Sequence, residues 1–110
     1  MPKYVCFFSY TREAGQAMIE KPTDRVGAAK ALVESVGGKM ECFYWMHGHH
    51  DGFFIADYKD GMSAAAVAAA AGSTGAITQL ETHELFDGAG QGQILRAAKT
   101  ALAGYKPPTA

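Results

Sequence analysis

The order in which strand-like and helix-like segments alternate is the feature that most constrains the fold of this chain. Segments dense in β-branched and aromatic residues, which favour strands, occupy residues 3–10, 39–46, 51–58 and 77–86. Segments with helical spacing or high helix propensity occupy residues 13–19, 26–36, 64–71 and 93–103. Thr11, Thr23 or Asp24, and Ser63 are the expected N-caps of the first three helices.

This order, β-α-β-β-α-β with an extra C-terminal helix, predicts an α+β fold of the ferredoxin-like type. Right-handed crossovers place the strands in an antiparallel sheet of order 4-1-3-2, with the crossover helices on one face. Because 110 residues suffice for only one domain, we expect residues 1–105 to form a single domain. The last five residues, 106–110, are expected to form a disordered tail.

Composition excludes several classes of protein. The chain has 10 basic and 11 acidic residues and no basic run, so we expect neither a nucleic-acid partner nor binding to a membrane surface. No apolar stretch approaches the roughly 20 residues that span a bilayer, and the N-terminus does not resemble a signal peptide. We therefore expect a cytoplasmic protein. Two cysteines, Cys6 and Cys42, form neither a disulfide framework nor a zinc set and are interpreted as free core thiols.

The strands are apolar on both faces, whereas a sheet covered by helices on one face should have a polar outer face. In the third strand, Phe53 and Ile55 alternate with Phe54 and Ala56. In the second strand, alternation predicts one face formed by Met40, Cys42, Tyr44 and Met46 and another formed by Phe43 and Trp45. Either another subunit or the terminal helix covers the outer face. We favour a homo-oligomer, whose paired sheets would form a dimeric α/β barrel with an interior pocket for a small molecule.

The segment between the second and third strands concentrates groups that can carry chemistry. His47, His49, His50 and Asp51 fall within five positions, and we expect His83 and Glu84 at the same end of the sheet. Imidazole and carboxylate groups bind transition metals, which makes the four histidines candidate ligands. No fixed metal-binding spacing is present, so no metal site is favoured and no cofactor is predicted.

Acid–base catalysis is a second interpretation of the same segment. His50 can transfer a proton near neutral pH and Asp51 can orient it, which makes these two the candidate catalytic residues. Alternatively, Asp51 only caps the turn by accepting hydrogen bonds from backbone amides. The candidate ligand-binding residues are the aromatic and polar side chains expected near the pocket, namely Tyr10, Tyr44, Trp45, Phe53 and Asp57. The glycines of the DGAGQGQ segment, Gly88, Gly90 and Gly92, are interpreted as a connector, because the strand–turn–helix unit of a dinucleotide site is absent.

Over about residues 1–86, the chain resembles the GYD-domain family. The resemblance rests on the segments Met1-Pro2-Lys3-Tyr4-Val5, Tyr10-Thr11, Gly37-Gly38-Lys39, Phe43-Tyr44-Trp45 and Gly48-His49-His50-Asp51. It implies a ferredoxin-like fold of the dimeric α/β-barrel group and a bacterial origin, but no reaction. His50 occupies the position where the family signature has tyrosine, so only the side chain of Asp51 carries over as a candidate site residue.

The leading hypothesis is an oligomeric protein that binds a small aromatic or apolar molecule. The alternatives are a cofactor-free isomerase, cyclase or oxygenase that uses a hairpin histidine, and a metal-binding or purely structural assembly protein. The sequence does not decide whether the chain is an enzyme.

Overall fold

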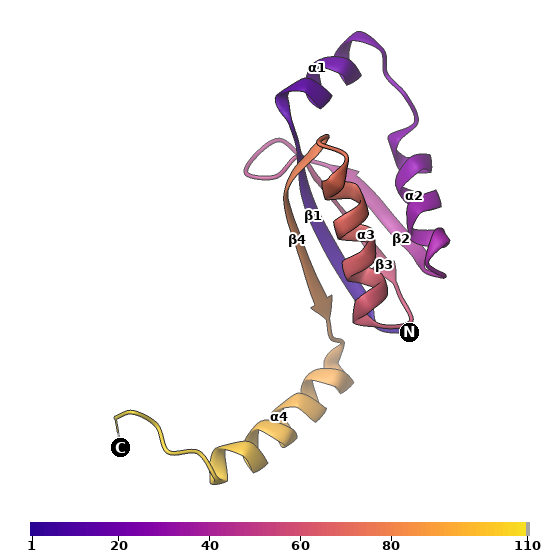
Figure 1. Ribbon diagram of the computed structural model, residues 1–110. Helices are drawn as coiled ribbons and strands as arrows, with labels where there is room; N and C mark the ends of the chain where they lie inside the picture. Colours follow the sequence, from indigo (N-terminus) through magenta and orange to yellow (C-terminus); the bar gives the residue numbers. More distant parts are fainter. Residues whose placement is uncertain (110) are drawn as a thin grey trace.

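The computed structural model describes residues 1–109 and confirms the α+β fold (Figure 1). The strands are β1 (Lys3–Tyr10), β2 (Lys39–Trp45), β3 (Gly52–Asp57) and β4 (Ile77–Leu85), and the helices are α1 (Arg12–Glu20), α2 (Arg25–Ser35), α3 (Gly61–Ser73) and α4 (Gly88–Ala103). The strands form one antiparallel sheet in the order β2-β3-β1-β4, which is the predicted order. Helices α2 and α3 lie on the same face of the sheet (Figure 1).

Side-chain caps fix where the helices begin. The hydroxyl of Thr11 accepts a hydrogen bond from the Ala14 amide, and Asp24 caps α2 in the same way, as the sequence predicts. The prediction of Ser63 as the cap of the third helix is wrong, because the Asp60 carboxylate accepts hydrogen bonds from the amide and hydroxyl of Ser63, both at 2.9 Å. The amide of Ser63 holds the pKa of Asp60 below its usual value.

The connector interpretation of the DGAGQGQ segment is also wrong. Asp87 accepts a hydrogen bond from the amide of Gly90 at 2.8 Å, so α4 already begins at Gly88. A capped first turn thus offsets the low helix propensity of the glycines in this segment.

The core lies between the sheet and the helices. Phe8 contacts Phe43 with ring centroids 5.4 Å apart, and Phe43 stacks on Phe54 at 6.1 Å. Val33 of α2 and Ala56 of β3 have no exposed surface. The alternation predicted for β3 is confirmed, with Phe54 and Ala56 in this core beside Tyr4, Cys6 and Phe8 of β1.

The predicted faces of β2 need one correction. A register shift between Met40 and Cys42 adds a residue to the strand, so Met40 packs against the core on the same face as Phe43. Cys42 pairs with Ile55 and Tyr44 with Phe53, which places these two β2 residues on the outer face of the sheet. A strict two-residue alternation fails wherever such a bulge occurs.

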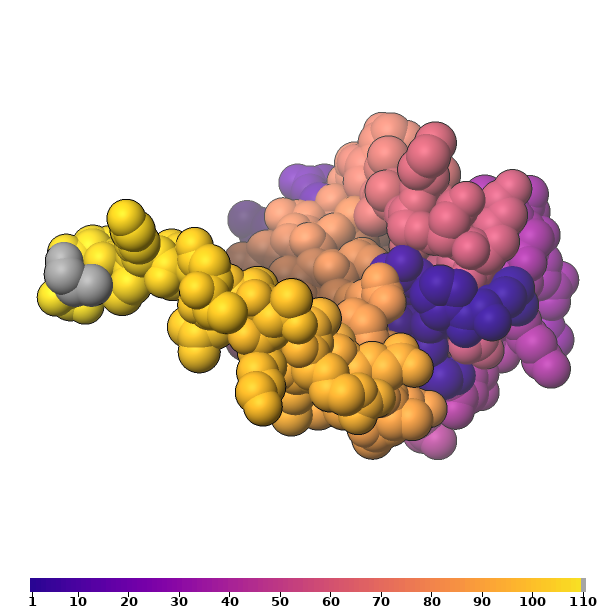
Figure 2. Space-filling view, turned by 90° about the horizontal axis from the view of Figure 1, so that it is seen from below, coloured from indigo at the N-terminus to yellow at the C-terminus, as the bar shows by residue number. Residues whose placement is uncertain are grey.

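Helix α4 does not cover the outer face of the sheet. It continues from the end of β4 and projects away from the body (Figures 1 and 2). The radius of gyration of 17.6 Å therefore exceeds the roughly 13 Å expected of a compact chain of this length. Leu95 and Leu102 of α4 are 58% and 68% exposed.

Residues 105–109 after α4 contain no helix or strand, and the last residue of the expected tail lies outside the described part. Within residues 1–109, none of the helices has the length and apolar character needed to cross a bilayer.

Gly52, at the start of β3, provides a test of how closely the strands and the Phe8 ring pack together. A Cβ atom there would lie 2.6 Å from the Phe8 ring and 2.9 Å from the Tyr44 carbonyl oxygen. We expect Gly52→Ala to lower the free energy of unfolding by about 1–3 kcal/mol, measured by urea denaturation. Gly48 has no neighbouring atom within 4 Å of its added Cβ. The control Gly48→Ala should therefore change stability by less than about 0.5 kcal/mol, and equal losses in both variants would contradict this packing.

Candidate functional site

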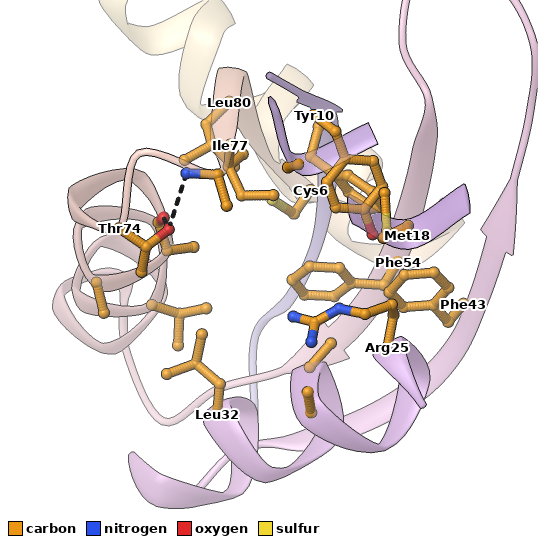
Figure 3. A pocket seen from close by; sticks show the side chains of 18 of the residues that line it. Cys6, Tyr10, Met18, Arg25, Leu32, Phe43, Phe54, Thr74, Ile77 and Leu80 are labelled. Carbon is orange, nitrogen blue, oxygen red and sulfur yellow. Dashed lines mark hydrogen bonds between the residues drawn. The ribbon is translucent and has the colours of Figure 1, made fainter. Parts of the chain in front are cut away.

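A cavity of about 610 Å³ lies between the sheet and the first three helices (Figure 3). Its floor is formed by Cys6, Phe8, Phe43 and Phe54 of the sheet. Its walls consist largely of alanine, with Ala14 and Ala17 from α1, Ala28 and Ala29 from α2, and Ala68, Ala70 and Ala71 from α3. A methyl side chain cannot fill the space between a helix and a sheet, so the alanine-rich helices leave room above the aromatic floor.

A few polar groups border this apolar cavity. The guanidinium of Arg25 points into it beside Phe43 and Phe54 (Figure 3). Among residues 1–109, no carboxylate lies within ion-pair distance of Arg25. Thr74 also borders the cavity, but its hydroxyl already donates to the Ala71 carbonyl at 2.8 Å and accepts from the Ala76 amide at 3.2 Å. Arg25 is exposed to solvent, so it supplies a hydrated positive charge without an ion-pair partner at the border of the cavity.

The thiol of Cys6 belongs to the cavity floor and is 5% exposed. Burial raises the pKa of this thiol, which keeps it protonated and weakly nucleophilic. Burial also raises the pKa of the neighbouring core residue Tyr58 to about 12. Both cysteines are free, as the sequence predicts. The interpretation of Cys42 as a core thiol is wrong, because it is half-buried on the outer face of the sheet, where it pairs with Ile55.

The candidate ligand-binding residues do not gather in one place. Tyr10 lines the cavity. Tyr44 and Phe53 pack together on the outer face with ring centroids 5.9 Å apart. Asp57 accepts a hydrogen bond from the Lys3 ammonium at 3.0 Å. Trp45 lines a smaller hollow beside α1, so neither this hollow nor the cavity brings the five residues together.

Asp51 ties the β2–β3 loop to the central strand. Its carboxylate accepts a hydrogen bond from the Tyr10 amide at 2.8 Å, and its own amide donates to the Phe8 carbonyl at 2.9 Å. These contacts correspond to the alternative in which Asp51 organises the turn. They continue the pairing of β1 past the start of β3 and hold the loop in place.

The loop does not lie at the predicted end of β4. It lies beside the start of that strand, because β4 runs antiparallel to β1 and pairs Ile77 with Tyr10. Glu84, expected near the histidines, instead pairs with Tyr4 towards the opposite end of the sheet and accepts a hydrogen bond from the Tyr4 hydroxyl at 3.3 Å.

A residue that the sequence analysis missed, Glu81, meets two of the predicted histidines. One of its carboxylate oxygens lies 3.3 Å from Nε2 of His50, and the other lies 3.5 Å from Nε2 of His83. His50 is buried and His49 contacts it, with ring centroids 4.6 Å apart. His47 instead borders the smaller hollow beside α1. Only the register of β4 could have identified Glu81, since no local motif marks it.

Replacement of Asp51 separates its structural role from a catalytic one. Asp51→Ala leaves the Tyr10 amide without its acceptor, and we expect it to lower the free energy of unfolding by about 1–3 kcal/mol. Asp51→Asn keeps an acceptor oxygen and should lower it less. Urea denaturation of the two variants measures both effects, and an equal loss in both would show that the hydrogen bond to Tyr10 is not the stabilising contact.

Comparison with known proteins supports the resemblance that the sequence indicates. The model of the GYD domain matches residues 4–95 of the 110-residue chain. Neither the curated proteins nor the solved structures gave a match. Because the matched region includes the sheet except for the first residue of β1, the three helices that line the cavity and the β2–β3 loop, the chain belongs to the GYD-domain family.

Proposed function

We propose that this protein binds a small, largely apolar molecule that carries an anionic group, in the cavity between the sheet and the helices. The observation that carries the proposal is the combination of an apolar cavity with a bordering guanidinium, that of Arg25, which has no ion-pair partner among residues 1–109. The volume of about 610 Å³ falls within the range typical of small-molecule sites.

The chemistry of the lining supports both parts of such a ligand. Contact with apolar side chains contributes roughly 25 cal/mol for each Å² of apolar surface removed from water. The stacked rings of Phe43 and Phe54 offer a flat surface to an aromatic group. Arg25 can donate two parallel hydrogen bonds to a carboxylate or sulfonate, and Lys21 at the cavity border adds a second positive charge.

The arrangement favours binding over acid–base catalysis. His50 and Asp51, the candidate catalytic residues, are not among the residues that line this cavity. The carboxylate of Asp51 is engaged by the Tyr10 amide. Of the cavity's ionisable groups, the Cys6 thiol is held protonated, so the lining supplies contact and charge rather than a proton acceptor.

Two related fluorescent probes test the proposal. 1-Anilinonaphthalene-8-sulfonate carries an anionic group, and N-phenyl-1-naphthylamine is its uncharged parent. We expect both probes to bind. Arg25→Gln should weaken binding of the sulfonate by about 2- to 5-fold, because an ion pair to an exposed arginine contributes up to about 1 kcal/mol, and it should leave binding of the uncharged probe unchanged. Fluorescence titration measures both affinities.

Control variants make the outcome specific. Arg12 is an arginine of α1 that does not line the cavity, so Arg12→Gln should leave both affinities unchanged. Ala71→Phe inserts a ring into the cavity and should weaken the binding of both probes. Binding of both probes that is insensitive to Ala71→Phe would place them elsewhere and contradict the proposal.

A second proposal concerns self-association through the outer face of the sheet. This face carries Phe7, Phe53, Ile55 and Tyr44, and Tyr44 is 60% exposed. Helix α4 does not cover it, and it is far more apolar than a solvated sheet face needs to be. The resemblance to proteins that pair two such sheets into a barrel supports a second copy of this chain as the partner.

The mass in solution tests this second proposal. We expect the protein to have a multiple of its 11.7 kDa chain mass by light scattering, and Tyr44→Glu to yield the single chain. Met62 is 82% exposed on α3, on the other side of the sheet, so Met62→Glu is a control that should leave the mass unchanged. A wild-type protein of 11.7 kDa would refute the proposal.

A further inference from the structure

A cluster of two histidines and one glutamate lies at the edge of the outer face, on the side of the sheet opposite to the ligand cavity. His49 and His50 come from the β2–β3 loop, and Glu81 comes from β4. One ligand atom from each residue lies within 4.8 Å of the ligand atoms of the other two. Glu81 follows the two adjacent histidines by more than 30 positions in the sequence and meets them only in the folded chain.

One distance within the cluster already fits a metal ion. Ligand bonds of about 2.0–2.2 Å at tetrahedral angles place neighbouring ligand atoms about 3.3–3.6 Å apart. Nε2 of His50 and the carboxylate of Glu81 are 3.3 Å apart. His49 and Glu81 are exposed, so small rotations of their side chains can close the remaining distances without disturbing the core.

His50 is oriented by its surroundings. Its ring is buried, packs against Phe7 at a centroid distance of 5.5 Å, and has Nδ1 3.5 Å from the Ser9 hydroxyl oxygen. The Ser9 hydroxyl can donate to the His49 carbonyl or the Gln79 side chain while its oxygen accepts from Nδ1–H of His50. This arrangement leaves the lone pair of Nε2 free, 3.3 Å from a carboxylate oxygen of Glu81, as in a histidine that can ligate a metal.

A backbone irregularity places the glutamate. The pairing of β1 with β4 shifts between Phe7 and Ser9, and Gln79 in β4 adopts a positive φ of 47°. This bulge puts Glu81 opposite Phe7, next to His50. His83 follows on the same face, and its Nε2 lies 3.5 Å from the second oxygen of Glu81, so it can hold the carboxylate in place.

We propose that His49, His50 and Glu81 form a binding site for one divalent transition-metal ion, with Zn²⁺ as the best fit. Two neutral imidazoles and one carboxylate form a ligand set that suits zinc, and they leave the fourth tetrahedral position open to water or an exogenous ligand. The site is independent of the cavity, because the two lie on opposite faces of the sheet and share no lining residue.

Equilibrium dialysis of tag-free protein against Zn²⁺, followed by elemental analysis, tests the site. We expect one zinc ion per chain in the wild type. Glu81→Gln and His49→Ala replace exposed ligands, so the fold should persist, and each should weaken zinc binding by at least about tenfold. The control His47→Ala removes an exposed histidine of the same loop that is not in the cluster and should leave binding unchanged.

Cobalt provides a second readout. Co²⁺ at this site should give the intense visible absorption of a tetrahedral N/O-liganded ion, lost in Glu81→Gln and retained in His47→Ala. His83→Ala should lower the affinity for the metal ion by about 10- to 100-fold, because it removes a partner of the ligating carboxylate. Failure of the wild type to retain zinc, or an equal loss in His47→Ala and His49→Ala, would overturn the proposal.

Discussion

The structure depends on the central strand β1, which pairs with β3 on one side and with β4 on the other. Its inward residues, Tyr4, Cys6 and Phe8, belong to the core, and Cys6 and Phe8 also form part of the cavity floor. Its outward residues, Phe7 and Ser9, contact His50, one of the two histidines of the proposed metal site. Because side chains alternate across a strand, this one segment supports two different sites on opposite faces of the sheet.

The composition of the helices explains why the cavity exists. A helix that packs against a sheet usually fills the space between them with branched apolar side chains. Here α2 and α3 present mostly alanine to the aromatic floor, so a space open to solvent remains between them. A ligand that fills this space and binds the folded chain would stabilise it, which links the small side chains to the binding function proposed above.

The apolar residues of helix α4 lie outside the core of the single chain. Its leucines, Leu95 and Leu102, stay exposed because the helix leaves the body instead of folding back on the sheet. A lone amphipathic helix of this kind gains most of its stability from packing, so its apolar side is suited to contact with another chain. Both the outer sheet face and this helix thus present apolar surface outside the single-chain core, and they support the same oligomeric proposal.

The sequence by itself determined the order of the strands and helices, the sheet topology and the family. Strand propensity, capping residues and right-handed crossovers act over short stretches of chain and can be read locally. Only the tertiary structure decided that Met40 turns inward after a bulge, that Asp60 and Asp87 cap their helices, and that Glu81 instead of Glu84 meets the histidines. The register of β4 against β1 and the space left between alanine helices and aromatic strands arise from contacts between residues far apart in the chain, and local patterns do not encode such contacts.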